Sequence, residues 1–241
     1  MTTIWYDELD STNSEAVRRL DSLDNMSVIA AFCQSKGRGK DTRKWLSSPG
    51  ENLTFTIVLK YGIPKEKFQS DRIAENFTDE TAGRTSANLP PFPASCQMAL
   101  SAAAAASVVT FLAGEGISAW VKWPNDVYVG KSKICGILIE HRMRGNYLKE
   151  SIIGIGININ QTSFPEELVN PVSVATLTGK RLDLKPSLEK FCRIFSDRLR
   201  SVYRELPHLK DIISGAFAAE DGAARDENAR ACFSECVNIL L

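Results

Sequence analysis

The amino-acid sequence predicts an α+β fold, in which helices flank a mixed and largely antiparallel central sheet. Strand-like and helix-like segments come in blocks, without the regular alternation of strand, helix and strand that builds a parallel sheet. The strand-like segments 133–140 and 147–157 are joined by the turn residues Gly145 and Asn146, which predicts an antiparallel hairpin. Together these observations favour antiparallel over parallel strand pairing.

The N-terminal part of the chain predicts three strands and one short helix. Residues 3–9, 28–33 and 53–59 are rich in apolar side chains and are bounded by polar segments, as buried strands are. Thr12 and Glu15 match the capping-box pattern S/T-x-x-E, so we expect a helix to begin there, between the first two strands.

The middle of the chain predicts an exposed excursion followed by a helix and two further strands. Residues 61–94 contain charges, Asn, Thr and a proline cluster but no periodicity, which is typical of an exposed segment. The alanine-rich segment 95–112 predicts a helix that ends before two glycines. Short strands are expected at 118–123 and 126–129.

The C-terminal part predicts one amphipathic helix and a tail. Apolar residues between positions 188 and 202 recur every three or four residues, which indicates a helix with one buried face. The tail, 215–241, is rich in Ala, Glu, Asp and Arg and is expected to be weakly helical or disordered. The chain is long enough for one main domain, here 1–214, with the tail as an appendage.

Composition narrows the class of protein. Lys+Arg and Asp+Glu both number 29, so no overall charge attracts nucleic acid or a membrane surface, and any anion site must be local. No apolar run of 18 residues predicts a membrane span, and the polar start lacks the pattern of a signal peptide. Six scattered cysteines predict free thiols in the cytoplasm, and the two histidines lack metal-ligand spacing, so no metal site is expected.

Three segments carry possible binding chemistry. In the loop 34–45, Gly37 and Gly39 flank an arginine, and four cations lie between positions 38 and 44. Backbone N–H groups and cations in such a loop can hold an anion, although a solvated basic loop explains the pattern equally well. The spacing is not that of a P-loop.

Lys122 is the key residue of the second segment, Val121–Asp126. A lysine within an apolar strand is costly to bury without an anionic partner, so at a strand end it can meet a phosphate or carboxylate. The alternative is a lysine on the solvated face of a half-buried strand.

The third segment, Gly154–Asn160, alternates glycine with isoleucine, so one face of the strand is bare backbone. Bare backbone in a strand indicates a ligand or another chain segment packed flat against it, and Asn158 can then bond a heterocycle. Close packing of a helix on that face is the alternative.

Together the motifs resemble those of biotin–protein ligases, in the family's order, from about residue 4 to 205. The matching motifs are Ser11-Thr12-Asn13, Gln34 with Gly37-Arg38-Gly39, Lys122-Trp123-Pro124-Asn125-Asp126, Gly136-Ile137-Leu138-Ile139-Glu140 and Gly154-Ile155-Gly156-Ile157-Asn158. The resemblance implies a catalytic domain at 1–214 with the fold shared by class II aminoacyl-tRNA synthetases and biotin ligases.

The resemblance also implies the reaction. Such an enzyme activates biotin with Mg²⁺ and ATP to biotinyl-5′-adenylate and passes the biotinyl group to a lysine of a biotin carboxyl carrier protein. Biotin and ATP are substrates, Mg²⁺ accompanies ATP, and no tightly bound metal, nucleic acid or membrane is expected. The protein is expected to be a monomer or homodimer.

Site residues follow from the same resemblance. The implied catalytic residues are Lys122 and Arg38. The implied biotin-binding residues are Ser11, Thr12, Asn13, Gln34, Arg38, Gly39, Lys122 and Gly136. The implied nucleotide-binding residues are Lys40, Arg43, Trp45, Lys122, Asn125 and Asn158. Fixed cations suit this chemistry, because a carboxylate attacks an α-phosphate and needs no general base at neutral pH. We expect loop 35–44 to be poorly ordered without ligand.

The sequence departs from the family pattern in four places. Lys40 replaces an arginine and Thr42 a glycine, the excursion 61–94 is long, and the tail lacks the pattern of the family's C-terminal β-barrel domain, which we expect to be absent. No DNA-binding segment is expected. Two other functions stay open: a lipoate or octanoate–protein ligase-like acyltransferase, and a catalytically weakened biotin-binding sensor.

Overall fold

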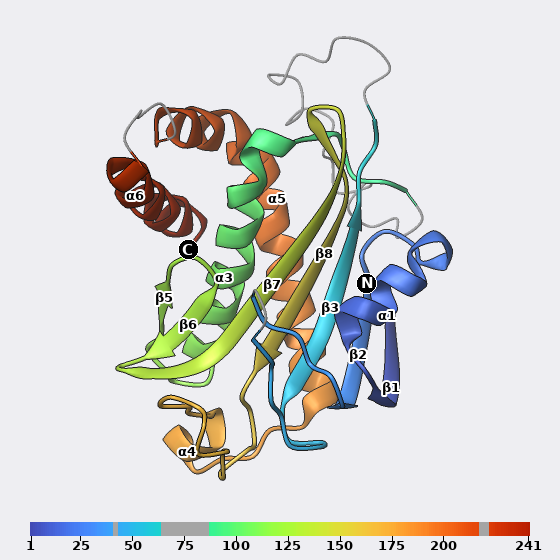
Figure 1. Ribbon diagram of the computed structural model, residues 1–241, viewed down its shortest axis with the longest axis vertical. Helices are drawn as coiled ribbons and strands as arrows, with labels where there is room; N and C mark the ends of the chain where they lie inside the picture. The colour runs from blue at the N-terminus through green and yellow to red at the C-terminus, as the bar shows by residue number, and fades with distance from the viewer. Residues whose placement is uncertain (41–42, 64–86, 217–221) are drawn as a thin grey trace.

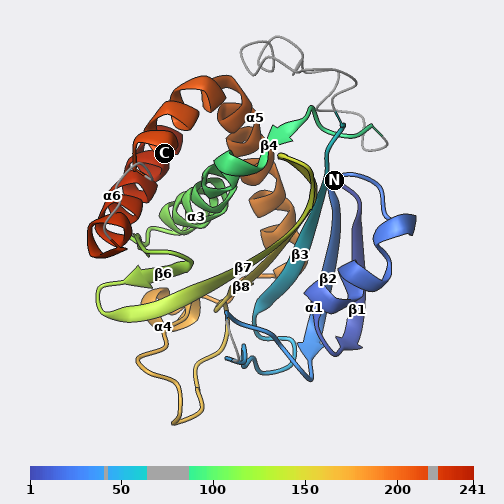
Figure 2. The ribbon, with the colours of Figure 1, turned by 45° about the horizontal axis from the view of Figure 1, so that its top comes forward.

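The computed structural model describes residues 1–40, 43–63, 87–216 and 222–241. Within these residues one mixed sheet separates helix α1 on one face from α3 and α5 on the other (Figures 1 and 2). The strands are β1 (Thr3–Leu9), β2 (Ser27–Gln34), β3 (Leu53–Lys60), β4 (Phe92–Pro93), β5 (Trp120–Lys122), β6 (Asp126–Val129), β7 (Ser132–Arg144) and β8 (Tyr147–Ile157). The α-helices are α1 (Thr12–Arg18), α3 (Gln97–Ala113), α4 (Val174–Thr178), α5 (Leu184–Ala216) and α6 (Gly222–Leu240).

The sheet confirms the predicted fold class. Its order is β1-β2-β3-β8-β7-β6-β5, with β4 paired to β8 at one end. Among the described strands β1 and β2 are parallel, and the other pairs are antiparallel. The expected hairpin is present as β7 and β8, with the turn at Gly145. The central strands β3 and β8 are therefore neighbours in space although far apart in the chain.

The main core lies on the face of the sheet covered by α3. Its alanines from Ala102 to Ala106 are fully buried, and their small side chains let the helix lie close to the sheet and to α5 and α6. The segment Ala94–Ala113 would pass as a membrane span by length and hydropathy, contrary to the expectation from sequence. Because 72% of its most apolar window is buried within the fold, α3 is a core helix.

Helix α1 covers part of the opposite face with a second, smaller core. Ala16 and the residues after it, Leu20 and Leu23, pack on Ile29, Val58 and Ile152. The helix begins one residue earlier than the capping box predicts, so that prediction is wrong in detail. Ser11 is the N-cap and accepts a long hydrogen bond from the Ser14 amide (3.5 Å), while Glu15 bonds other side chains.

Two segments differ from the sequence-based expectation. The excursion has buried ends: Tyr61, Leu89 and Phe92 are nearly inaccessible, and only 64–86 lie outside the described residues. The expected weak or disordered tail contains α6, whose Phe233 and Cys236 are buried against α3 and α5. The apolar residues of α6 recur three or four positions apart, and this periodicity is the signal that composition concealed.

A buried polar cluster joins the far ends of β3, β7 and β8. Ser151 is fully buried, and its hydroxyl accepts a hydrogen bond from Tyr61 (3.0 Å) and lies 2.8 Å from Nδ1 of His141. Burial lowers the pKa of His141 to about 4 from its ordinary value of 6.5. The folded state therefore holds this imidazole neutral.

We expect His141 to make stability fall as the pH is lowered from 6.5 towards 4. In that window the unfolded chain binds a proton at His141 that the folded chain does not bind, so up to about 1.4 kcal/mol is lost per pH unit. Urea unfolding of wild type and His141→Gln between pH 6.5 and 5 measures the difference, about 2 kcal/mol at most. The exposed His208→Gln is the control, and parallel pH dependence of wild type and His141→Gln would contradict the prediction.

Candidate functional site

A cavity of about 500 Å³ lies on the face of the sheet that α1 covers only in part. Its floor is formed by β7 and β8, one wall by the start of α1, and the other wall by the loop after β2. The lining contains five basic residues, Arg38, Lys40, Arg43, Lys44 and Lys133, and two acidic ones, Asp126 and Glu167. The chain as a whole is neutral, so this local excess of positive charge favours an anionic ligand.

The floor is bare backbone made by paired glycines. Gly136 of β7 is directly opposite Gly156 of β8, and Gly154 lies two residues further along the same face. The indole of Trp45 lies on this patch: a Cβ at Gly156 would be only 2.6 Å from its Nε1 and Cζ2, and one at Gly136 3.0 Å from Cζ3. The face of β8 that the sequence predicted to be bare backbone is therefore covered by the indole ring of Trp45.

Asn13 covers the third glycine of the floor. A Cβ at Gly154 would be 2.9 Å from the side-chain Cγ of Asn13, which is itself buried. The Thr56 hydroxyl donates to Asn13 Oδ1 (2.6 Å), and Asn13 Nδ2 donates to Glu140 (2.9 Å). Hydrogen bonds at both ends of its amide therefore hold Asn13 against the floor.

The loop after β2 forms a small hairpin over the cavity. Arg38 and Lys44 form an antiparallel bridge, and the amides of Gly39 and Trp45 donate to Arg43 O (2.9 Å) and Gly37 O (3.0 Å). Residues 41–42, and with them Thr42, lie outside the described residues. The expectation that loop 35–44 is poorly ordered without ligand therefore stays a prediction.

Arg38 is held by an acidic residue of β7. Its Nη2 donates to Oε1 of Glu140 at 2.7 Å, and its Nη1 donates to Oε2 at 3.1 Å. Two parallel bonds to one carboxylate fix the plane of the guanidinium as well as its position.

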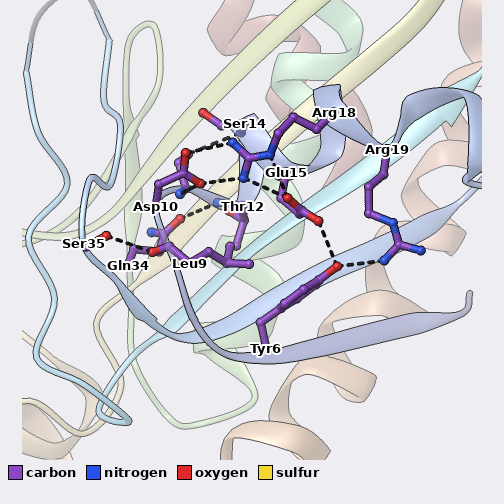
Figure 3. A network of polar contacts seen from close by, with 11 residues as sticks. Tyr6, Leu9, Asp10, Thr12, Ser14, Glu15, Arg18, Arg19, Gln34 and Ser35 are labelled. Carbon is purple, nitrogen blue, oxygen red and sulfur yellow. Dashed lines mark hydrogen bonds and ion pairs between the residues drawn. The ribbon is translucent and has the colours of Figure 1, made fainter.

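The start of α1 is anchored by a network of side chains (Figure 3). Gln34 accepts from the Thr12 amide at 2.7 Å, which ties the end of β2 to the first turn of the helix. Arg18 donates two bonds to Asp10 (2.7 and 2.8 Å), and this guanidinium lowers the pKa of Asp10 far below its ordinary value. These contacts hold the cavity wall in place.

Two asparagines use their side chains to shape the other end of the cavity. Asn158 is buried and donates from Nδ2 to Val172 O (3.0 Å), and Asn125 donates from Nδ2 to Ile137 O (3.0 Å). Lys133 forms an ion pair with Asp126 (2.6 Å) and lies 5.9 Å from the centre of the Trp45 ring. Polar and cationic groups therefore surround the aromatic ring.

Comparison with known proteins decides the family. The model of the biotin/lipoate A/B protein ligase family matches residues 6–158, more than half of the chain. The chain belongs to this family.

Relatives of this ligase-family chain include the bifunctional ligase/repressor BirA of Bacillus spizizenii, 28% identical over 82% of the chain and 53% of that protein. The biotin–[acetyl-CoA-carboxylase] ligase of Paracoccus denitrificans is 28% identical over 78% of the chain and 68% of that protein. The chain spans about half the length of the Bacillus protein. A solved structure of the biotin protein ligase of Aquifex aeolicus in complex with biotin and ATP has a TM-score of 0.59 and 27% identity, and the match covers 85% of this chain and 72% of that one.

The residues implied by the family resemblance line the cavity, with one exception. Those placed there are Ser11, Thr12, Asn13, Gln34, Arg38, Gly39, Lys40, Arg43, Trp45, Asn125, Gly136 and Asn158. Lys122 does not line the cavity: it is exposed, and its Nζ lies 4.9 Å from the centre of the Tyr128 ring. Since Tyr128 lines the cavity, Lys122 lies close to it, in contact with this ring.

Sequence reasoning missed several residues that line the cavity. Tyr128 and Lys133 line the cavity, and a segment of the loop after β8, Glu167–Val169, closes its rim. The alternation of Tyr128 with buried Val127 could have indicated an exposed face of β6. Nothing in the sequence indicated the rim segment, because its position depends on the backbone pairing of Lys133 with Pro171.

Replacing Gly156 with alanine is expected to displace Trp45 from the cavity floor. The new methyl group cannot fit beneath the indole, so overpacking should reduce stability by about 1–3 kcal/mol and move tryptophan emission to longer wavelength. Gly215→Ala, with open space around its Cβ, is the control. The spectral change should vanish in a Trp45→Phe background, and its persistence there would contradict the assignment.

Proposed function

We propose that this chain activates biotin with ATP to biotinyl-5′-adenylate and transfers the biotinyl group to a lysine of a biotin carboxyl carrier protein. The observation that carries the proposal is the cavity: a bare glycine floor under an aromatic ring, next to five basic residues. Trp45 covers the glycines, so its indole is the flat surface on which a ring of the ligand can stack, and a carboxylate and a triphosphate need cations. The names of the Paracoccus and Aquifex relatives support biotin and ATP as the substrates.

The first step joins two anions, so its barrier is electrostatic. The biotin carboxylate attacks the α-phosphorus, a C–O–P anhydride forms, and pyrophosphate leaves. Positive charge fixed near the reacting atoms stabilises the negative charge that develops on the phosphate oxygens. Arg38 already has a fixed guanidinium plane, and Lys122 can swing on its flexible stem from Tyr128 to the cavity edge.

We assign Mg²⁺ to the nucleotide, as part of the co-substrate. Within the described residues no group of three His, Cys, Asp or Glu side chains is placed to hold a metal ion. In the second step the carrier lysine attacks the mixed anhydride, an amide forms, and AMP leaves. A closed loop 35–44 would keep water from the anhydride during this interval.

The same proposal includes the organisation of the chain. Residues 1–214 form the catalytic unit, and the addition 215–241 contains α6, which packs on α3 and α5. The protein acts in the cytoplasm as a monomer or homodimer, with the carrier domain as partner and without nucleic acid or membrane. Free cysteines and zero net charge support this assignment.

The function is tested by mass spectrometry of a biotin carboxyl carrier domain after incubation with the protein, biotin, Mg²⁺ and ATP. A gain of one biotinyl group on a single lysine is expected, with pyrophosphate release that depends on biotin. Parallel reactions with lipoate and octanoate separate the two branches of the family. Transfer of octanoate alone, or biotin binding without pyrophosphate release, would refute the proposal in favour of an acyltransferase or a sensor.

We expect Lys122→Ala to lower the rate of adenylate formation on the order of 10²-fold while biotin affinity stays near that of wild type. The lost ammonium acts on the transition state, and removal of one such group has this magnitude. Rapid-quench measurement of pyrophosphate gives the rate, and calorimetry gives the affinity. Lys131→Ala, an exposed lysine in the next turn, is the control. An unchanged rate in the Lys122 variant would remove this residue from the mechanism.

A further inference from the structure

Glu140 joins the two walls of the cavity. It is on β7, opposite Ile152 of β8, on the same face as Gly136 and Leu138. Its carboxylate accepts from Arg38 of the loop and from Asn13 of α1. The residue itself does not line the cavity, and both of its partners do.

The geometry around the carboxylate is specific. Arg38 occupies both oxygens, at 2.7 and 3.1 Å, and Asn13 Nδ2 donates to the same oxygen, Oε2, at 2.9 Å. Asn13 extends this series of hydrogen bonds, because its Oδ1 accepts from the buried Thr56 hydroxyl, which also lies 2.8 Å from Thr12 Oγ1. One carboxylate therefore connects the arginine of the loop with the floor and the α1 wall.

These contacts contribute little to holding the fold together. The side chains of Arg38 and Glu140 are 44% and 34% exposed, and exposed ion pairs add little to stability because water screens them. A bidentate pair does restrict side-chain motion, and an arginine ordered before the ligand arrives loses less entropy on binding. The ion pair uses two of the five guanidinium N–H donors, so Arg38 can contact an anion while Glu140 holds it.

We propose that Glu140 is a positioning residue that couples Arg38, whose guanidinium the proposed mechanism uses at the reacting carboxylate and α-phosphate, to Asn13 on the biotin side of the cavity. The inference rests on the proposed function for the identity of the two ligands. It predicts that substitutions at position 140 can remove the contact to Arg38 and the contact to Asn13 to different extents.

The experiment compares Glu140→Gln with Glu140→Ala. Glutamine keeps one carbonyl oxygen, which can accept from Asn13 and from Nη1 of Arg38, but its NH2 group cannot accept from Nη2, so the charge and the second bond of the ion pair are lost. Alanine removes both contacts. Glu51→Gln is the control, because both oxygens of Glu51 accept from Nη2 of Arg181, at 2.9 and 3.1 Å, and Glu51 is 30% exposed and lies outside the cavity. Calorimetry measures biotin and ATP affinity, and biotin-dependent pyrophosphate release gives the KM for ATP and kcat.

Glu140→Gln is expected to raise the KM for ATP about tenfold, the size of effect that one charge-assisted contact has, and to lower biotin affinity less than Glu140→Ala does, because Asn13 stays bonded. Glu140→Ala should weaken both ligands, and Glu51→Gln neither. In an Arg38→Ala background Glu140→Gln should have no further effect on the KM for ATP.

Three results would overturn the inference: a Glu140→Gln variant indistinguishable from Glu51→Gln, tighter ATP binding in that variant, or full additivity with Arg38→Ala. Tighter binding would show that Glu140 competes with the nucleotide for Arg38. Failure of the proposed function looks different, because wild type itself would then release no pyrophosphate with biotin. The coupling would in that case be judged by the calorimetric affinities alone.

Discussion

The site depends on one constraint, the close approach of side chains to bare backbone where Gly136 is paired with Gly156. Without a Cβ on either strand, an indole can lie flat on the sheet, and two residues further along Gly154 admits an asparagine. Larger residues would lift Trp45 and Asn13 away, and with them the loop and the helix start to which they belong. The strand pairing sets the register, and the register aligns the glycines.

The two faces of the sheet have different roles, one in stability and the other in forming the cavity. One face is closed by α3, α5 and α6 and holds most of the buried apolar area. Among the described residues the other face carries the short helix α1 (Figure 2), and the cavity with its polar and cationic side chains lies beside it, over β7 and β8. Stability and ligand chemistry are thus placed on opposite sides of the same strands. A neutral protein can in this way present a locally positive cavity.

Sequence patterns predicted those parts of the structure that depend on residues close together in the chain. The β7–β8 hairpin followed from its turn and from apolar alternation, and the bare face of β8 from its glycines. The cover of that face could not be predicted, because Trp45 reaches it from a loop distant in sequence. The segment of α6 was expected to be weakly helical or disordered, because charged residues and alanines outnumber its buried face, which packs against α3 and α5. The motif identified Lys122, but on a three-residue strand its direction is decided by a tertiary neighbour, Tyr128.

The uncharged helix α3 also bears on how the chain is made. It packs on the sheet and against two helices, α5 and α6, that follow it in sequence, and the strand β8 beside β3 is also synthesised later. At ordinary translation rates, on the order of ten seconds pass between the synthesis of α3 and the synthesis of the helices that pack on it. During that time a long apolar segment is accessible to chaperones, or to other nascent chains. The time for which α3 stays uncovered therefore depends on how fast the ribosome completes the second half of the chain.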